Sequence, residues 1–322
     1  MRGVALCCGF NAYREAPLVT AINDATSVHS TLMSNRLYGR DAALMRTSKP
    51  ITHDTATADD VLSALKAIAS GPAELIWFSF SGHGLVANGE LQLLLPLWAK
   101  SRHSRYSIRS AALEAILRQH RDKRFVIVLD ACHTGAFGMR GPRYLKDMPR
   151  DVEPGVVARP RIDPGVVVLS SCARDQRASD GSLTGGLING LFTHCLLTLL
   201  RAHQQANTTL SALRLFLDVA SLMRGQYASA QRPILYANGL VDDFTILLGD
   251  EVNAGTRDLG APHDVAAIAR GARGRQRSPR DRVADDPPRY THVDGGADPR
   301  VPGYASAQLS AMPMSTSSGT LS

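Results

Sequence analysis

The feature that most constrains the fold is a series of short apolar runs that alternate with stretches of helical periodicity. Phe125–Leu129 is continuously apolar, as strands are when both faces of a parallel sheet are buried. Similar runs cover Val4–Gly9, Glu74–Ser81 and Gly165–Ser171, and we expect Ile234–Ala237 to form a last edge strand. Because helical patterns separate these runs, the chain favours an open α/β sheet that is covered by helices on both sides.

The expected helices share apolar residues at the spacing of one helix face. They are Pro17–Ser34, a helix through Val61 and Ile68, Ser107–His120, Gly186–Ala202 and Leu210–Arg224. Two further extended segments are expected at Ala43–Arg46 and Leu91–Leu95.

The composition divides the chain into a folded part and a tail. The 322 residues are 44% hydrophobic, which is enough to bury one large core or two modest ones. We expect a domain over residues 1–249, in which a basic, proline-containing loop over 139–164 separates residues 1–138 from 165–249. Beyond it, large apolar residues become rare, and we expect a mostly disordered tail over 250–322.

Several functional classes are excluded by composition. No apolar run approaches the ~20 residues that span a bilayer, and the first strand has no secretory leader, so we expect no membrane segment and a cytoplasmic protein. The five cysteines form no C-x-x-C pair, which argues against zinc and against a disulfide framework. The net charge is +7, with eight basic and two acidic residues from Ala99 to Arg124. Only Tyr106 is aromatic there, so we interpret this patch as a solvated helix face and expect no nucleic-acid binding.

Two of the strand-like runs are followed directly by residues whose side chains can take part in catalysis, His83 and Cys132. The carboxyl ends of parallel strands meet at one edge of a sheet, so these residues can lie together although 49 positions separate them. A thiolate is the nucleophilic form of cysteine, and an imidazole can take the thiol proton and protonate a leaving amine. The alternative is that Cys132 is a buried structural thiol. His133 is a second candidate base, ranked lower because adjacent side chains at a strand end tend to point apart.

With these motifs the chain resembles the caspase-fold cysteine peptidases (clan CD, peptidase C14), in particular the metacaspases and bacterial caspase-like proteins. The similarity runs from about Gly3 to Leu248. It rests on six segments in this order: Ala5–Tyr13, Ala21–Ala25, Ser81–Gly84, Asp130–Gly135, Ser170–Gln176 and Phe192–Thr193. The resemblance implies a three-layer α/β/α sandwich with a mostly parallel central sheet, a large-subunit-like part over 1–138 and a small-subunit-like part over 165–249.

The resemblance also implies roles for individual residues. It assigns Cys132 as the nucleophile and His83 as the general acid/base of a peptidase that acts through a thioacyl-enzyme. It further implies an oxyanion hole made by the backbone N–H groups of Cys132 and Gly84, which are held in place before charge develops on the substrate. The rival function is a catalytically weak caspase-like scaffold for signalling or binding.

Substrate choice follows from an acidic pair that metacaspases carry in the specificity pocket. Asp24 and Asp130 match this pair, with Ser81 nearby. Two carboxylates attract a guanidinium or ammonium group and repel a substrate aspartate, so we expect cleavage of proteins or peptides after Arg or Lys. The alternative is that Asp24 only caps the first helix.

The chain departs from calcium-activated metacaspases, which have aspartates after the strand matched by Leu91–Leu95 and beyond the nucleophile. Leu97–Ala99 and Phe137–Met139 offer none, and hard cations need several oxygen ligands. We therefore expect no cofactor, no metal site and no calcium control through these positions. The basic loop 139–164 would suit the enzyme's own specificity, so self-processing there is a hypothesis, with an uncut linker as the alternative. No oligomeric state follows from these patterns.

Overall fold

The computed structural model describes residues 1–39, 48–99, 105–137, 164–179, 188–227, 229–237 and 243–249. The chain divides into two units, Met1–Gln276 and Arg277–Ser322, and the second lies outside the described residues. The expected strand Ala43–Arg46, residues 139–163 of the basic loop and the tail 250–322 also lie outside them.

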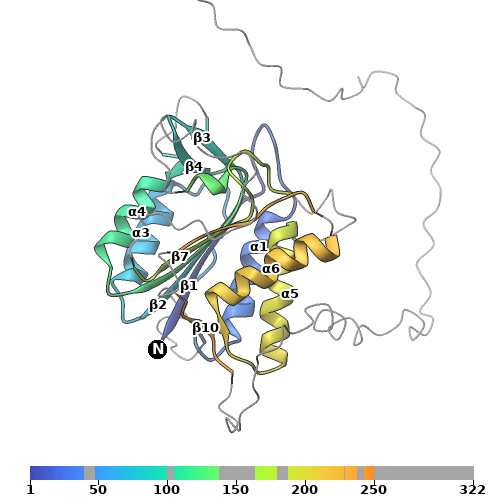
Figure 1. The fold of residues 1–322 in the computed structure, drawn as a ribbon. Helices are drawn as coiled ribbons and strands as arrows, with labels where there is room; N and C mark the ends of the chain where they lie inside the picture. The colour runs from blue at the N-terminus through green and yellow to red at the C-terminus, as the bar shows by residue number, and fades with distance from the viewer. Residues whose placement is uncertain are drawn as a thin grey trace, which may run out of the picture. The chain divides into compact units, whose positions relative to one another are not determined.

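A five-stranded sheet forms the centre of the fold (Figure 1). Its strands, in spatial order, are β1 (Gly3–Gly9), β2 (Leu75–Ser81), β6 (Arg124–Asp130), β7 (Val166–Ser170) and β9 (Ile234–Tyr236). The first four run parallel, and β9 pairs antiparallel with β7 at the edge. The expected α/β architecture with a mostly parallel sheet is confirmed.

Helices cover both faces of this sheet (Figure 1). On one face lie α1 (Ala21–Met33), α5 (Leu191–Gln205) and α6 (Ala212–Tyr227). On the other lie α3 (Ala58–Ala69) and α4 (Ser110–Gln119). β8 (Leu210–Ser211) and β10 (Thr245–Leu247) form a short antiparallel pair. Among the described residues, no helix is both long enough and apolar enough to cross a membrane.

Four helices begin later than the sequence predicts. The first helix begins at Ala21 rather than Pro17, because the chain before it forms a turn in which the Leu18 N–H donates to the Asn11 carbonyl. The helix predicted from Ser107 begins three residues later, because the residues before it form a strand. The helix predicted from Gly186 begins at Leu191, and the helix predicted from Leu210 begins at Ala212, after the strand β8. Apolar periodicity extends past the true boundary ahead of α1 and α4, because Leu18 and Ile108 also pack onto the core.

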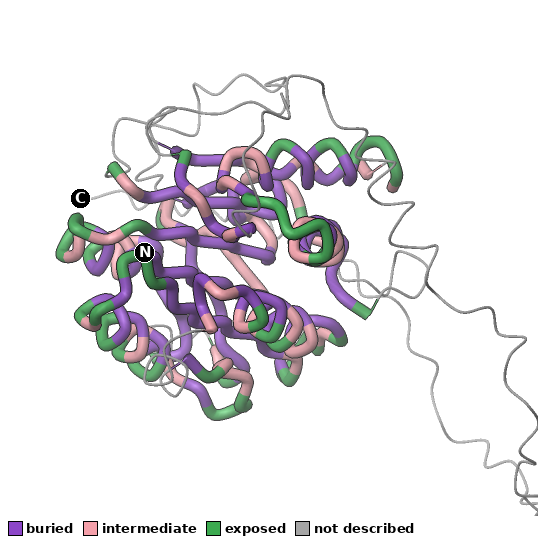
Figure 2. The backbone as a smooth tube through the Cα atoms, turned by 90° about the horizontal axis from the view of Figure 1, so that it is seen from below, coloured by how far each residue is buried: buried purple, intermediate pink, exposed green. Residues whose placement is uncertain are grey.

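Alternate side chains of the central strands enter two separate cores. In β2, Ile76, Phe78 and Phe80 pack with residues of α3 and α4, whereas Leu75 and Trp77 pack with residues of α1, α5 and α6. All residues of β1 and β2 are buried (Figure 2), which explains why the strands read as continuous apolar runs.

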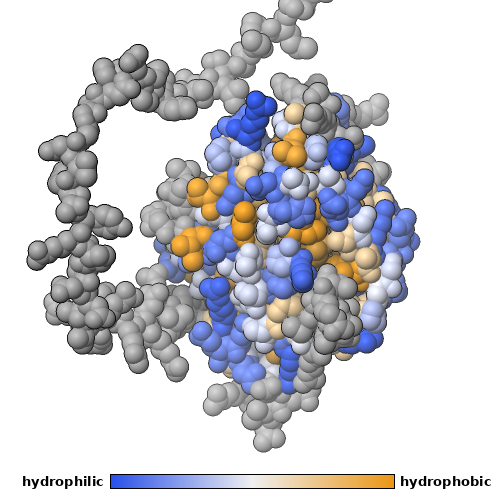
Figure 3. Space-filling view, turned by 180° about the vertical axis from the view of Figure 1, so that it is seen from behind, coloured by the Kyte–Doolittle hydropathy of each residue, from blue (hydrophilic) through white to orange (hydrophobic). Residues whose placement is uncertain are grey.

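Some large hydrophobic side chains lie on the surface of the described part. On the face in Figure 3, hydrophobic residues are interspersed with hydrophilic ones rather than gathered in one area. The large hydrophobic residues that are exposed within the described part include Val19 and Ile188. Scattered exposed apolar side chains of this kind are normal for a folded domain.

A second, antiparallel sheet stands at the end of the molecule where β2 finishes (Figure 1). It comprises β3 (Gly84–Ala87), β4 (Glu90–Leu94) and β5 (Ser107–Arg109). Asn88 and Gly89, with φ of 52° and 73°, form the two-residue turn between β3 and β4. An Asn-Gly pair is the strongest short hairpin signal, because both residues tolerate positive φ, whereas the apolar pattern predicts only one extended run here.

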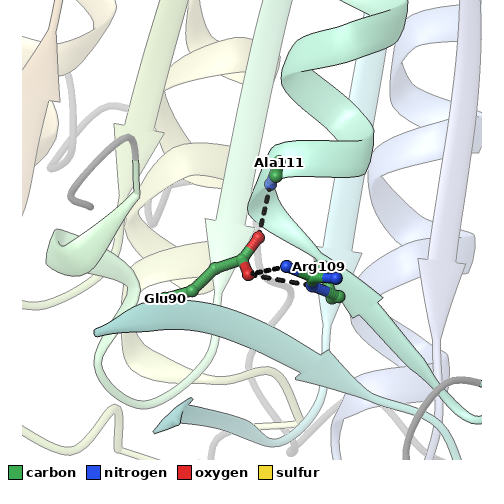
Figure 4. Close-up of polar contacts among 3 residues, drawn as sticks. All are labelled: Glu90, Arg109 and Ala111. Atoms are coloured by element: carbon green, nitrogen blue, oxygen red, sulfur yellow. Dashed lines mark hydrogen bonds and ion pairs between the residues drawn. The ribbon is translucent and has the colours of Figure 1, made fainter. Parts of the chain in front are cut away.

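Glu90 ties this sheet to α4 (Figure 4). One carboxylate oxygen accepts from Arg109 Nε and Nη2 at 2.8 and 2.6 Å, and the other accepts from the Ala111 N–H at 2.8 Å. Because the first N–H groups of a helix have no partner inside it, Glu90 caps α4 from a neighbouring strand. The sheet is thereby anchored beside the end of β2.

Candidate active site

The pairing of β2 with β6 brings the two predicted catalytic segments together. Ser81 lies opposite Asp130 at the ends of these parallel strands, and each chain continues for two residues, to His83 and Cys132. The Gly82 N–H donates to the Asp130 carbonyl at 3.2 Å. The histidine and cysteine segments therefore leave the sheet side by side.

Cys132 is the one cysteine of the five that is not buried, which argues against a purely structural thiol. Burial raises the pKa of its thiol, and the negative charge of Asp130 adds to this effect. A backbone hydrogen bond from Ala178 and the positive charge of Arg177 act in the opposite direction. The resting group is thus the thiol, which needs a base to become nucleophilic.

His83 is held in one orientation by the loop after β1. Its Nε2 lies 2.6 Å from the Ala16 carbonyl oxygen, and its ring centroid lies 4.4 Å from that of Tyr13. A carbonyl oxygen can only accept, so Nε2 carries the hydrogen and Nδ1 of the neutral ring keeps a free lone pair. Nδ1 is therefore the nitrogen that can accept a proton in the neutral ring.

His133, the second candidate base, is engaged elsewhere. It has a left-handed backbone with φ of 62°. Its Nδ1 lies 2.7 Å from the Arg174 carbonyl oxygen, and its backbone N–H donates to the Gln176 carbonyl at 3.1 Å. The ring is therefore bound to the segment after β7 through Nδ1, as that of His83 is bound to Ala16 through Nε2, and the rank of His133 below His83 stays a prediction.

Asp24 on α1 and Asp130 at the end of β6 converge although 106 positions separate them. Both are buried, with 2% and 7% of their surface exposed. A side-chain carbon placed on Gly190 would lie 3.0 Å from Asp130 Oδ2 and 3.3 Å from Asp24 Oδ2. Because Gly190 is the N-cap of α5, the two carboxylates meet at the N-terminus of that helix.

This helix end supplies hydrogen-bond donors to both carboxylates. Asp24 Oδ1 accepts from the Gly190 N–H at 3.1 Å and from Asn189 Nδ2 at 2.8 Å. Asp130 Oδ2 accepts from the Thr193 N–H at 3.2 Å and from its hydroxyl at 2.6 Å. A helix N-terminus has unpaired N–H groups and a favourable field for anions, so it stabilises two acids that would otherwise repel each other.

The carboxyl of Asp24 nevertheless resists ionisation. Burial raises its pKa to about 7, the charge of Asp130 contributes in the same direction, and hydrogen bonds from Asn189, Ser81 and Gly190 oppose the rise. Ser81 donates its hydroxyl to Asp24 Oδ2 at 2.7 Å. Since these partners lie on β2 and ahead of α5, the alternative that Asp24 only caps its own helix is wrong.

All six predicted site residues lie at one end of the central sheet: Asp24, Ser81, His83, Gly84, Asp130 and Cys132. The sequence patterns do not point to Ala16, Asn189 and Gly190. An Asn-Gly pair directly before an apolar helical pattern is a helix-start signal and would have marked the last two. Within the described ranges, no group of three or more His, Cys, Asp or Glu side chains is arranged to hold a metal ion.

Comparison with known proteins agrees with this architecture. A family model described as the caspase domain (peptidase C14) matches residues 2–245. No curated protein matches the sequence significantly.

Solved structures similar to this chain include a protein from Geobacter sulfurreducens, at 16% identity and a TM-score of 0.48, over 78% of this chain and 96% of that one. Caspase-1 from Spodoptera frugiperda is 12% identical with a TM-score of 0.47, over 73% and 86%. The Drosophila initiator caspase Dronc is 10% identical with a TM-score of 0.45, over 76% and 81%. Because the caspase-domain model covers the greater part of the sequence, the chain belongs to the caspase family of peptidases, C14.

Proposed function

We propose that this chain is a cysteine endopeptidase of metacaspase type that cleaves after Arg or Lys, with Cys132 as nucleophile and His83 as general acid/base. The observation that carries the proposal is the buried pair of Asp24 and Asp130, which lies at the strand end from which Cys132 emerges. Membership of a peptidase family supports hydrolysis of protein substrates.

The first half-reaction forms a thioester. His83 Nδ1 takes the proton of the Cys132 thiol, and the thiolate attacks the carbonyl carbon of the scissile bond. The oxyanion that develops accepts hydrogen bonds from the backbone N–H groups of Cys132 and Gly84. When the tetrahedral intermediate collapses, the imidazolium gives its proton to the leaving amine, and the acyl group stays on sulfur.

The second half-reaction releases the product acid. His83 takes a proton from a water molecule that attacks the thioester, and it returns the proton to the sulfur of Cys132 as the carbon–sulfur bond breaks. The hydrogen bond from Nε2 to the Ala16 carbonyl persists in both states of the ring and strengthens when the ring is charged. This carbonyl therefore stabilises the imidazolium that forms between the two proton transfers.

The acidic pair accounts for the preference in the P1 position. A guanidinium or ammonium group that enters between Asp24 and Asp130 relieves their mutual repulsion and the burial of uncompensated charge. A substrate aspartate would add a third negative charge and is rejected. The raised pKa of Asp24 measures how unfavourable its ionisation is beside Asp130. A bound cation compensates this charge and therefore binds more favourably.

The test uses fluorogenic peptides that end in Arg, Lys or Asp, assayed with wild type, Cys132→Ala and Asp130→Asn. We expect hydrolysis of the Arg and Lys peptides only, none with Cys132→Ala, and a large loss with Asp130→Asn. Cys7→Ala is the matched control, because Cys7 is a buried cysteine of β1. Activity on the Asp peptide alone contradicts the specificity, and no activity on any peptide favours the scaffold function instead.

Processing and location complete the proposal. The peptidase domain spans residues 1–249, and we propose that the enzyme cuts itself within the basic loop 139–164 in a reducing, cytoplasmic compartment. Cys132 has to be a free thiol to act as the nucleophile, and a reducing compartment keeps it so. Incubation of the purified protein beside Cys132→Ala tests the self-cleavage, and identical intact bands would exclude it.

A further inference from the structure

Three hydrogen bonds close a ring around the backbone of His83. The Leu94 N–H donates to the His83 carbonyl at 2.9 Å, Tyr13 donates its hydroxyl to the Leu94 carbonyl at 2.8 Å, and the His83 N–H donates to the Tyr13 hydroxyl oxygen at 3.1 Å. The carbonyl of Leu94 can only accept, so the hydroxyl proton points to it and leaves a lone pair for His83. Each polar group of the ring is satisfied.

Tyr13 also contacts the side chain of His83. Its aromatic ring lies against the imidazole, with centroids 4.4 Å apart and planes inclined by 58°. The tyrosine is buried, with 7% of its surface exposed. The same loop, three residues later, supplies the Ala16 carbonyl that receives Nε2–H. One short segment therefore holds the backbone, one face and one nitrogen of the histidine.

Gly82 makes room for this contact. A side-chain carbon on Gly82 would collide with the Tyr13 hydroxyl, so the glycine before His83 allows the tyrosine to reach the backbone of the histidine. The burial of Tyr13 also raises the pKa of its phenol well above its ordinary value. The hydroxyl thus remains a donor throughout the range in which a peptidase of this kind works.

We propose that Tyr13 is a positioning residue, which holds the imidazole of His83 in place for proton transfer to and from Cys132 by fixing its backbone and one ring face. The inference rests on the proposed function, because it assigns Tyr13 a part in that reaction. Tyr13 itself does not touch the reacting atoms. A small displacement of a general base lowers the rate of proton transfer without weakening the hold on the substrate.

The experiment compares wild type with Tyr13→Phe, which keeps the ring and loses the hydroxyl, and Tyr13→Leu, which loses both. On an Arg peptide we expect kcat to fall ~10-fold in Tyr13→Phe and ~100-fold in Tyr13→Leu, with KM unchanged within ~2-fold. Tyr38→Phe is the matched control. Tyr38 is also buried, packs on Gly3 at the start of β1, and its hydroxyl has no hydrogen-bond partner within the described residues.

A second measurement needs no substrate. Hydrogen exchange of the His83 amide should be ~10-fold faster or more in Tyr13→Phe and unchanged in Tyr38→Phe, because only the first variant removes the acceptor of this N–H. Wild-type kcat in Tyr13→Phe, a loss confined to KM, or unaltered exchange at His83 each overturn the positioning role. If the wild type cleaves no peptide, the proposed function is contradicted. The exchange rate of the His83 amide still tests whether Tyr13 holds the His83 backbone.

Discussion

Replacing Asp24 by asparagine should make the protein more stable and, at the same time, a poorer peptidase. The introduced side chain can keep the oxygen that accepts from Asn189 and Gly190, and its amide nitrogen can donate to the hydroxyl of Ser81, which is free to rotate. The packing and the hydrogen bonds of the pocket are therefore preserved. Only the charge is lost.

The magnitude follows from the raised pKa of Asp24. A rise from 3.8 to about 7 corresponds to at most ~4 kcal/mol, at ~1.4 kcal/mol per pH unit. Below pH 3.8 the carboxyl is protonated in both the folded and the unfolded chain, so the substitution has little effect there. As the pH rises from 3.8 to about 7, the carboxyl ionises in the unfolded chain but stays protonated in the folded chain, so wild type loses stability that Asp24→Asn keeps; above about 7 the difference is constant. Allowing for the cost of burying the amide, we expect a gain of ~2 kcal/mol at about pH 8.

The assay is thermal unfolding of wild type and Asp24→Asn from about pH 4 to about pH 8. A gain of ~2 kcal/mol raises Tm by ~4–8 °C at the upper end of this range, and the two proteins should coincide at the lower end. Asp218→Asn is the control, because Asp218 is a buried carboxylate with a cationic partner, Arg214, at 2.7 Å, and it should gain nothing. If Tm depends on pH in the same way in wild type and in Asp24→Asn, the reasoning from the acidic pair is refuted.

The same variant should lose ~10–100-fold in kcat/KM on Arg peptides, because a hydrogen bond to a charged group contributes ~1.5–3 kcal/mol. If Asp24→Asn loses activity and gains stability, the charge of Asp24 serves the function and does not stabilise the fold. If Asp24→Asn cleaves Arg peptides as well as wild type does, Asp24 has no part in the specificity.

Three further outcomes are expected. Thr193→Val removes the hydroxyl that donates to Asp130 at 2.6 Å and keeps the side-chain shape, so kcat/KM on Arg peptides should fall ~10-fold, and an unchanged value would show that this donor is dispensable. Gly9→Ala should destabilise the fold by ~3 kcal/mol or more in chemical denaturation, because its methyl group would collide with the backbone of Ala21 in α1; a loss under ~1 kcal/mol would contradict this close approach. Peptide hydrolysis should be the same in calcium and in a chelator, and a rate that requires calcium would refute the expected independence.

Much of the fold could be predicted because strands that are buried on both faces appear in the sequence as continuous apolar runs. Strands such as β2 and β6 must be apolar at nearly every position when helices cover both faces of the sheet, so the strands are recognisable as runs. The helix starts are less predictable, since Leu18 packs on the core before α1 begins. The β3–β4 hairpin has a local signal at Asn88-Gly89 that the apolar pattern overshadows.

The sequence by itself determined which residues stand at the strand ends, and hence that His83, Cys132, Ser81 and Asp130 share one edge of a parallel sheet. Only the tertiary structure decided what surrounds them. The contact of Asn189 with Asp24 joins residues 165 positions apart through the packing of α5 beside α1, and no spacing in the chain encodes it. The environment that raises the pKa of Asp24 is likewise produced by burial and by the charge of Asp130, and the helix end that opposes the rise comes from another part of the chain. The position of a strand end is a local property of the sequence. The electrostatic field and the hydrogen bonds at a site depend on groups from distant parts of the chain, which only folding brings together.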